Sequence, residues 1–235
     1  MSPHFRRASS RNLSRCYDQH KYQMQEGSAM KIGYHSIEHR IAYVLNMLTK
    51  RRLENPNYRV IDIGGSVTGW SATVVNTIVD INAGPKTIVV DICRPNSWSA
   101  ITDLVNKYGQ YDYAICTHTL EDIYDPFITL NMLPKIAKCG IITTPSIRTE
   151  LSNVESSFYL GYIHHRWLFG QENGQMLVAP KLGMLEALAR NNMTYEKDIE
   201  EIWYEWEDTL PYKIFMNNYR GPDAKTVVKN YSRLI

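Results

Sequence analysis

The 235-residue sequence contains only four cysteines, and no two of them form a C-x-x-C pair. Three of the four lie in or beside apolar runs. This spacing excludes the usual zinc motifs and a disulfide framework. We therefore expect buried thiols in a reducing compartment and a cytoplasmic location. The cysteines are Cys16, Cys93, Cys116 and Cys139.

Long apolar runs, internal repeats and low-complexity tracts are also missing. No run approaches the roughly 20 residues that a membrane span needs, so we expect no span. The chain has little net charge, +2 at pH 7, which argues neither for nor against nucleic acid. Its 44% apolar and 21% charged residues are ordinary for a globular protein and exclude wholesale disorder. The length suits one α/β domain plus an extension.

Acidic residues are scarce near the N-terminus. Residues 1–52 carry ten Lys/Arg and three Asp/Glu, and residues 1–17 contain four arginines and no acid. Such a segment suits a basic arm for RNA or another polyanion, an organelle targeting peptide, or a solvated terminus. We expect residues 1–35 to form a basic, partly irregular extension and residues 36–235 to form the main domain.

Hydrophobic periodicity predicts an amphipathic helix from Ser36 to about residue 50 and a buried strand over 58–63. Val, Ile and Thr fill six of the ten positions in 71–80, which favours a second strand ending in Asp80. The alternative is a helix over 70–81. A third strand is expected over 86–91, ending in Asp91.

Strands and helices continue to alternate. We expect a helix over 97–108, a strand over 111–116, a helix over 126–138 closed by Gly140, and a strand over 140–144. This alternation predicts an α/β fold with a doubly wound, mostly parallel sheet.

The chain changes character after Pro145. Residues 146–175 are rich in aromatics, histidine, Asn and Gly, and predict a long loop or lid. A short strand at 176–179 and a helix over 181–191 are expected next. Strands over 199–207 and 212–215 then suggest an antiparallel C-terminal edge pair.

The first strand ends in Asp62-Ile63-Gly64-Gly65. Glycines directly after a strand let the backbone turn sharply and approach a ligand closely. An acid at the same end can accept hydrogen bonds from a ligand's hydroxyl or amine. The layout predicts a nucleotide-like cofactor in the crevice at the carboxyl ends of the strands.

Three stretches carry a family resemblance: 60–65 (Val-Ile-Asp-Ile-Gly-Gly), 111–126 with His118-Thr119-Leu120-Glu121 inside it, and 138–146. Together they resemble the class I (Rossmann-like) S-adenosylmethionine-dependent methyltransferases, in a subgroup with a short first loop. The match covers roughly residues 58–216, and the second stretch is its most specific part. The resemblance implies a Rossmann-like fold, S-adenosyl-L-methionine as cofactor, and an unknown methyl acceptor.

The resemblance also implies roles for single residues. Asp80 would accept hydrogen bonds from the ribose, although the rival register gives that role to Asp91. The methionine end would be held by Asp62, Gly64, Gly65 and Ser66, the adenine side by Asp91 and Ile92, and the shelf beneath the cofactor would be Thr117 and His118. Ser66 and Thr68 stand where the family carries glycine, so a catalytically silent binding or assembly module is an alternative. An RNA-directed methyltransferase using the basic N-terminal region is another.

Methyl transfer is an in-line displacement, in which the enzyme mainly positions the acceptor. If the acceptor must lose a proton, His118, His164 and His165 are candidate bases, since histidine titrates near neutral pH. Arg166 could grip an anionic acceptor or fix the long loop by a salt bridge. No metal is expected, because the spacing lacks a metal signature and adjacent histidines point apart on a strand. The sequence leaves the oligomeric state open.

Overall fold

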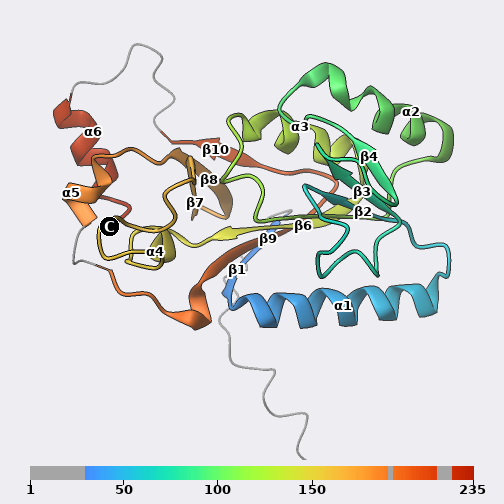
Figure 1. The fold of residues 1–235 in the computed structure, drawn as a ribbon, viewed down its shortest axis with the longest axis horizontal. Coiled ribbons are helices and arrows are strands. Elements are labelled where there is room, and N and C mark those ends of the chain that lie inside the picture. The colour runs from blue at the N-terminus through green and yellow to red at the C-terminus, as the bar shows by residue number, and fades with distance from the viewer. Residues whose placement is uncertain (1–29, 190–192, 216–223) are drawn as a thin grey trace, which may run out of the picture.

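The computed structural model describes residues 30–189, 193–215 and 224–235 (Figure 1). The basic segment at 1–17, with its RNA-binding and targeting hypotheses, lies outside these residues. Within the described ranges, no helix is long and apolar enough to cross a membrane. The strands are β1 (Met30–His35), β2 (Val60–Ile63), β3 (Thr77–Asp80), β4 (Thr87–Val89), β5 (Tyr113–Thr117), β6 (Cys139–Pro145), β7 (Trp167–Glu172), β8 (Gln175–Pro180), β9 (Glu201–Glu207) and β10 (Tyr212–Ile214).

Helices connect most of these strands. Ser36 caps the first helix, because its hydroxyl accepts a hydrogen bond from the backbone N–H of His39 at 3.2 Å. Asp125 caps the helix after β5 in the same way, at 3.0 Å from the N–H of Phe127. The α-helices are α1 (Ile37–Glu54), α2 (Ser99–Tyr108), α3 (Pro126–Ile136), α4 (Ile147–Glu150), α5 (Leu185–Ala189) and α6 (Ala224–Tyr231), and the 3₁₀ turns are η1 (Pro95–Trp98) and η2 (Lys197–Ile199).

The main sheet has seven strands in the order β1-β9-β6-β5-β2-β3-β4. The five strands from β6 to β4 run parallel, whereas β9 is antiparallel to both β6 and β1. Taken in chain order, those five follow the 3-2-1-4-5 arrangement of a doubly wound Rossmann-type sheet. The α/β, doubly wound, mostly parallel fold is therefore confirmed. The strand order reverses between β2 and β5.

Helices cover both faces of this sheet (Figure 1). On one face Val44 and Leu48 of α1 pack with Val60 and other buried strand residues. On the other face Ile101 of α2 and Leu133 of α3 pack into the larger core. Side chains of a strand alternate between faces, so β2 serves both cores and all four of its residues are buried.

A second, three-stranded sheet has the order β10-β8-β7 and its own core with α5 and α6. Asn173 and Gly174 join β7 to β8, and both have positive φ, 52° and 73°. A two-residue Asn-Gly loop with positive φ at both positions is typical of a tight β-hairpin.

Several element boundaries differ from the sequence predictions. The strand expected over 71–80 exists only from Thr77 to Asp80, and the rival helix over 70–81 is absent. Residues 71–76 form a turn, in which the N–H of Val75 donates to the carbonyl of Ser71 at 3.1 Å. The prediction that Asp80 ends the second of the parallel strands is confirmed.

The antiparallel edge pair has a different second member from the one expected. The edge pair is β9 with β1, because Met30 to His35 pair with Trp206 to Glu201. The strand at 212–215, observed as β10, instead pairs in parallel with β8 of the second sheet. Residues 30–35, which fell in the expected extension, thus belong to the main sheet.

Three further expectations fail wholly or in part. The loop expected over 146–175 contains α4 and β7, so only residues 151–166 between them lack regular structure. Of the predicted helix over 181–191, the part from Leu185 to Ala189 is helical and residues 181–184 are not, while residues 190 and 191 lie outside the described part of the chain. Gly140 does not close α3, which ends at Ile136; Gly140 lies in β6, where a Cβ would meet the backbone of Ala114.

Candidate functional site

A cavity of about 480 Å³ opens at the carboxyl ends of β2, β3 and β5, beside the point where the strand order reverses. Ligands bind at this point in open α/β sheets. The volume lies within the usual range for small-molecule sites, about 300–1,000 Å³. Its lining is Gly64, Val79, Asp80, Ile81, Val90, Asp91, Ile92, Cys93, His118, Thr119, Asp122, Ile123, Tyr124 and Arg166.

Gly64 forms the floor of the cavity next to β2. Its φ of +76° is a conformation that side chains rarely adopt, and a Cβ there would overlap Thr119. The N–H of Gly64 donates to the carbonyl of Val79 at 2.8 Å. At Gly65 a side chain is excluded for a different reason, because a Cβ there would overlap the carboxylate of Asp62.

Asp62 points beneath the loop rather than into the cavity. It is buried, 3% exposed, and accepts a hydrogen bond from the hydroxyl of Ser71. Burial raises the pKa of Asp62 to about 6, although Ser71 and Arg40 act in the opposite direction. Ser66, also predicted at the methionine end, bonds Thr68 on the exposed loop, with 3.1 Å between the two hydroxyl oxygens.

Asp80 and Asp91 both line the cavity, at the ends of neighbouring strands. One Asp80 oxygen accepts from the N–H of Asn82 at 2.6 Å. Asp91 accepts from the N–H of Cys93 at 3.1 Å and lies 2.9 Å from Arg94. The wall between them is apolar, formed by Val79, Val90 and Ile92.

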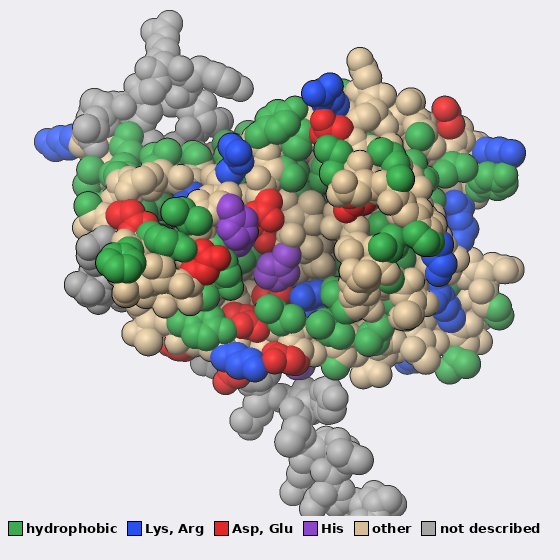
Figure 2. Space-filling view, in the orientation of Figure 1, with side chains coloured by type: hydrophobic (Ala, Val, Ile, Leu, Met, Phe, Trp, Pro, Cys, Tyr) green, Lys and Arg blue, Asp and Glu red, His purple; other side chains and the backbone are tan. Residues whose placement is uncertain are grey.

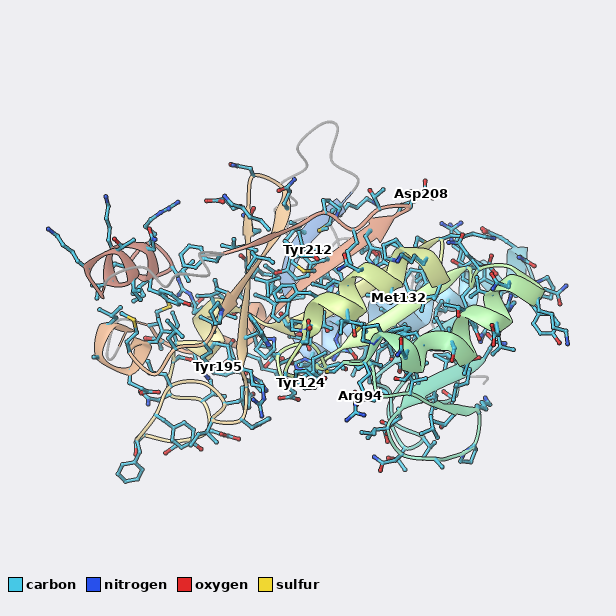
Figure 3. All side chains as sticks on the ribbon, turned by 90° about the horizontal axis from the view of Figure 1, so that it is seen from above. Arg94, Tyr124, Met132, Tyr195, Asp208 and Tyr212 are labelled. Carbon is cyan, nitrogen blue, oxygen red and sulfur yellow. The ribbon has the colours of Figure 1, made fainter. Side chains whose placement is uncertain are left out.

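The rim of the cavity carries aromatic and basic groups. Tyr124 donates a hydrogen bond from its hydroxyl to the carbonyl of Cys93 at 3.1 Å. In Figure 3 Tyr124 and Arg94 lie along the same edge of the molecule. Thr117, predicted for the shelf, does not line the cavity; its carbonyl accepts from the hydroxyl of Thr119 at 3.1 Å.

His118 lies at the cavity wall in a left-handed conformation, φ +49°. Its Nε2 contacts the carboxylate of Glu201, and its Nδ1 lies 3.3 Å from Oε1 of Glu121. Burial disfavours the charged imidazolium, but the two carboxylates outweigh it and raise the pKa of His118 to about 9. His118 therefore carries a proton at neutral pH.

Arg40 completes this buried network. It binds Glu201 with two nitrogens, at 2.8 and 3.1 Å, and both side chains are nearly inaccessible to water. Burial disfavours the Glu201 carboxylate, but His118 and Arg40 hold its pKa below its ordinary value. Arg40 and Glu201 are not among the site residues predicted from the sequence. One signal was available, since Arg40, Val44 and Leu48 recur every four residues on the buried side of α1.

His164 and His165 lie in a turn before β7 rather than on a strand, so the argument that they point apart is wrong. Nε2 of His164 and Nε2 of His165 lie 3.5 and 3.4 Å from Oδ1 of Asp122. The ligand-type atoms of the three residues all lie within 4.8 Å of one another, an arrangement that could hold a metal ion. In Figure 2 histidine side chains lie beside acidic ones near the middle of the face in view.

Arg166 follows the two histidines and lines the cavity. Its backbone N–H donates to the carbonyl of Glu121 at 2.7 Å, which fixes the turn against the loop after β5. The structure thus brings Gly64, Asp80, Asp91, Ile92, His118 and Arg166 to one cavity. Asp62, Gly65, Ser66, Thr117, His164 and His165 lie around it without lining it.

No protein-family model and no curated protein sequence matches the chain. Two structures of the methyltransferase domain of bacterial CtHen1 match the chain, each with a TM-score of 0.39, at 10% and 11% identity; the alignments cover 72% and 73% of this chain and 98% and 97% of theirs. The N-terminal domain of EvdMO1, crystallised with SAH and D-fucose, has a TM-score of 0.35 and 9% identity over 69% of this chain and 81% of its own. TM-scores and identities this low carry no argument about function, so the function of this chain has to be inferred from its own residues.

Proposed function

We propose that the chain is an S-adenosylmethionine-dependent methyltransferase. The observation that carries the proposal is the cavity at the reversal of strand order, with Gly64 at its floor and two carboxylates, Asp80 and Asp91, at successive strand ends. A ribose offers two hydroxyl donors and an adenine offers a flat apolar face. The carboxylates and the wall of Val79 and Val90 match those groups in chemistry.

In this proposal Asp80 holds the ribose and Asp91, with Ile92, the adenine side. Gly64 lets the backbone approach the ligand, while Asp62, Gly65 and Ser66 support the loop at the methionine end. When bound, the cofactor supplies an electrophilic methyl group on a sulfonium. The protein's part is to hold the acceptor in line with that group and to exclude water.

The protonation state of His118 decides whether it can act as a general base. Because its pKa is raised to about 9, it holds a proton at neutral pH and is a poor general base there. This supports a positioning role for His118 at the shelf beneath the cofactor. Arg166, which lines the same cavity, is the group proposed to contact the acceptor.

The catalytically silent alternative requires a blocked site. Trp70 is the bulky side chain nearest to the loop in sequence, but it packs with α1 and lies 5.1 Å from the guanidinium of Arg40. It is not part of the cavity lining. An open crevice beside Asp80 favours a ligand-binding enzyme over a silent module.

Calorimetry with S-adenosylhomocysteine tests the proposal. We expect one site per chain in the wild type and weaker binding in Asp80→Ala. A hydrogen bond to a charged group is worth about 1.5–3 kcal/mol, which corresponds to roughly a 10- to 150-fold loss of affinity. The matched control is Asp103→Ala, since Asp103 is exposed on α2 away from the cavity. Absence of binding, or equal affinity in wild type and Asp80→Ala, would refute the proposal.

A further inference from the structure

We propose that Asp122, His164 and His165 form a binding site for a divalent transition-metal ion beside the cavity. Two imidazole nitrogens and one carboxylate oxygen converge there, from the loop after β5 and from the turn before β7. This donor set is one that proteins use for zinc and for non-haem iron.

The spacing of the atoms fits an ion better than a network of hydrogen bonds. Oδ1 of Asp122 lies 3.5 Å from Nε2 of His164 and 3.4 Å from Nε2 of His165. Hydrogen bonds of this type are usually about 2.7–3.2 Å long. Ligands about 2.0–2.1 Å from a tetrahedral ion, however, lie about 3.3–3.4 Å from one another. The two separations from Asp122 are close to the edges of such a coordination sphere, and the three ligand atoms all lie within 4.8 Å of one another.

A buried carboxylate orients the inner histidine. Nδ1 of His165 lies 2.5 Å from Oε1 of Glu150, a side chain with 1% exposure. The other oxygen of Glu150 accepts from Lys181 at 2.7 Å. A proton held on Nδ1 by Glu150 leaves the Nε2 lone pair directed toward Asp122. Metal-binding histidines almost always have such a partner on their second nitrogen.

The backbone joins the two segments that carry the ligands. The N–H groups of Arg166 and Trp167 both donate to the carbonyl of Glu121, at 2.7 and 3.3 Å. Glu121 precedes Asp122, and Arg166 follows His165. These main-chain hydrogen bonds hold the segments that carry the ligand atoms next to each other. The backbone at the site therefore needs little ordering when an ion binds.

Three protein ligands leave at least one coordination position open, as in catalytic metal sites. Asp122 and Arg166 both line the cavity, so this position faces the space where a small molecule would bind. An ion there could accept an oxygen or nitrogen atom of that molecule as a further ligand. Mg²⁺ and Ca²⁺ are poor candidates, because both prefer sites made of oxygen ligands alone.

Metal binding to the full-length, chelator-treated protein tests this site. Zn²⁺ would be titrated by calorimetry, and Co²⁺ by visible absorption, which reports the geometry around the ion. We expect one ion per chain and no displacement by excess Mg²⁺. The variants Asp122→Asn and His164→Ala alter partly exposed side chains, 42% and 58%. Asp103→Asn is the matched control.

Loss of a carboxylate that only orients a ligand weakens metal binding about 10- to 100-fold, so loss of a direct ligand should cost at least about tenfold. Asp122→Asn and His164→Ala should both show this loss, whereas Asp103→Asn should bind as the wild type does. The proposal is overturned if the wild type binds no ion, or if both variants retain its affinity. The readout is binding alone, so it is independent of methyl transfer.

Discussion

The protonated His118 should make the stability of the fold depend on pH. Glu121 and Glu201 raise its pKa from 6.5 to about 9. A pKa raised on folding stabilises the protein fully below the unfolded pKa, near 6.5. That stabilisation disappears as the pH rises through about 9. The folded protein should therefore lose stability across this window.

The size of the effect follows from the shift. At about 1.4 kcal/mol per pKa unit, the full shift corresponds to about 3 kcal/mol. The side chain of His118 is 35% exposed, so water screens part of the interaction. We expect about 1–2 kcal/mol after this discount.

Urea unfolding of the wild type and of His118→Asn provides the assay. Asparagine tolerates the positive φ at this position better than other side chains do. Between about pH 6 and about pH 10, the free energy of unfolding of the wild type should fall by about 1–2 kcal/mol more than that of the variant. Groups such as Asp62 titrate in both proteins, so their contributions cancel in the difference. An equal loss in the two proteins, or an imidazole pKa below about 7.5 by NMR, would refute the reasoning.

Two further changes test the packing around the site. An alanine in the left-handed conformation costs roughly 1–2 kcal/mol. Gly64→Ala should lower the free energy of unfolding by more than this, because the new Cβ would overlap Thr119. The same overlap should abolish S-adenosylhomocysteine binding. Gly183→Ala, with nothing within 4 Å of its Cβ and no positive φ, is the control for adding a methyl group; a loss of stability in Gly64→Ala as small as the one in this control would contradict the steric argument. Leu133→Ala should lower the free energy of unfolding by about 2–5 kcal/mol, since this α3 side chain is fully buried in the larger core. A decrease below about 1 kcal/mol in urea unfolding would contradict that packing.

Local signals were enough to predict the parallel core of the sheet. The buried run ending at Ile63, the run ending at Asp80 and the run over 111–116 each appear in a few consecutive residues. Asn173-Gly174 is a recognisable hairpin signal, although it lies within the segment predicted as a loop. A composition rich in Val and Thr could not reveal the turn at 71–76, which depends on the contact between Ser71 and Asp62.

Apart from Arg166, the cavity-lining residues that could be predicted stand at or just after the end of a strand. Gly64, Asp80 and Asp91 have this property, and all three line the cavity. The partner of Arg40 is Glu201, which lies 161 residues away, and no local pattern links the two. The proximity of Asp122 to His164 and His165 likewise depends on tertiary structure. The predicted roles of the individual site residues stay predictions until ligand binding is measured.

The position of β9 between β1 and β6 has a consequence for synthesis of the chain. Strand β1 ends at residue 35 and its partner ends at residue 207, so the ribosome adds 172 residues before the pair can close. At about 5–20 residues per second, this takes roughly 9–34 s. Until β9 arrives, β1 presents an open edge, and so does β6 once residue 145 has been added; β9 pairs with both strands in the finished sheet. A nascent chain halted before residue 201 would keep those edges available to other strands, which makes timely arrival of β9 a safeguard against misassembly.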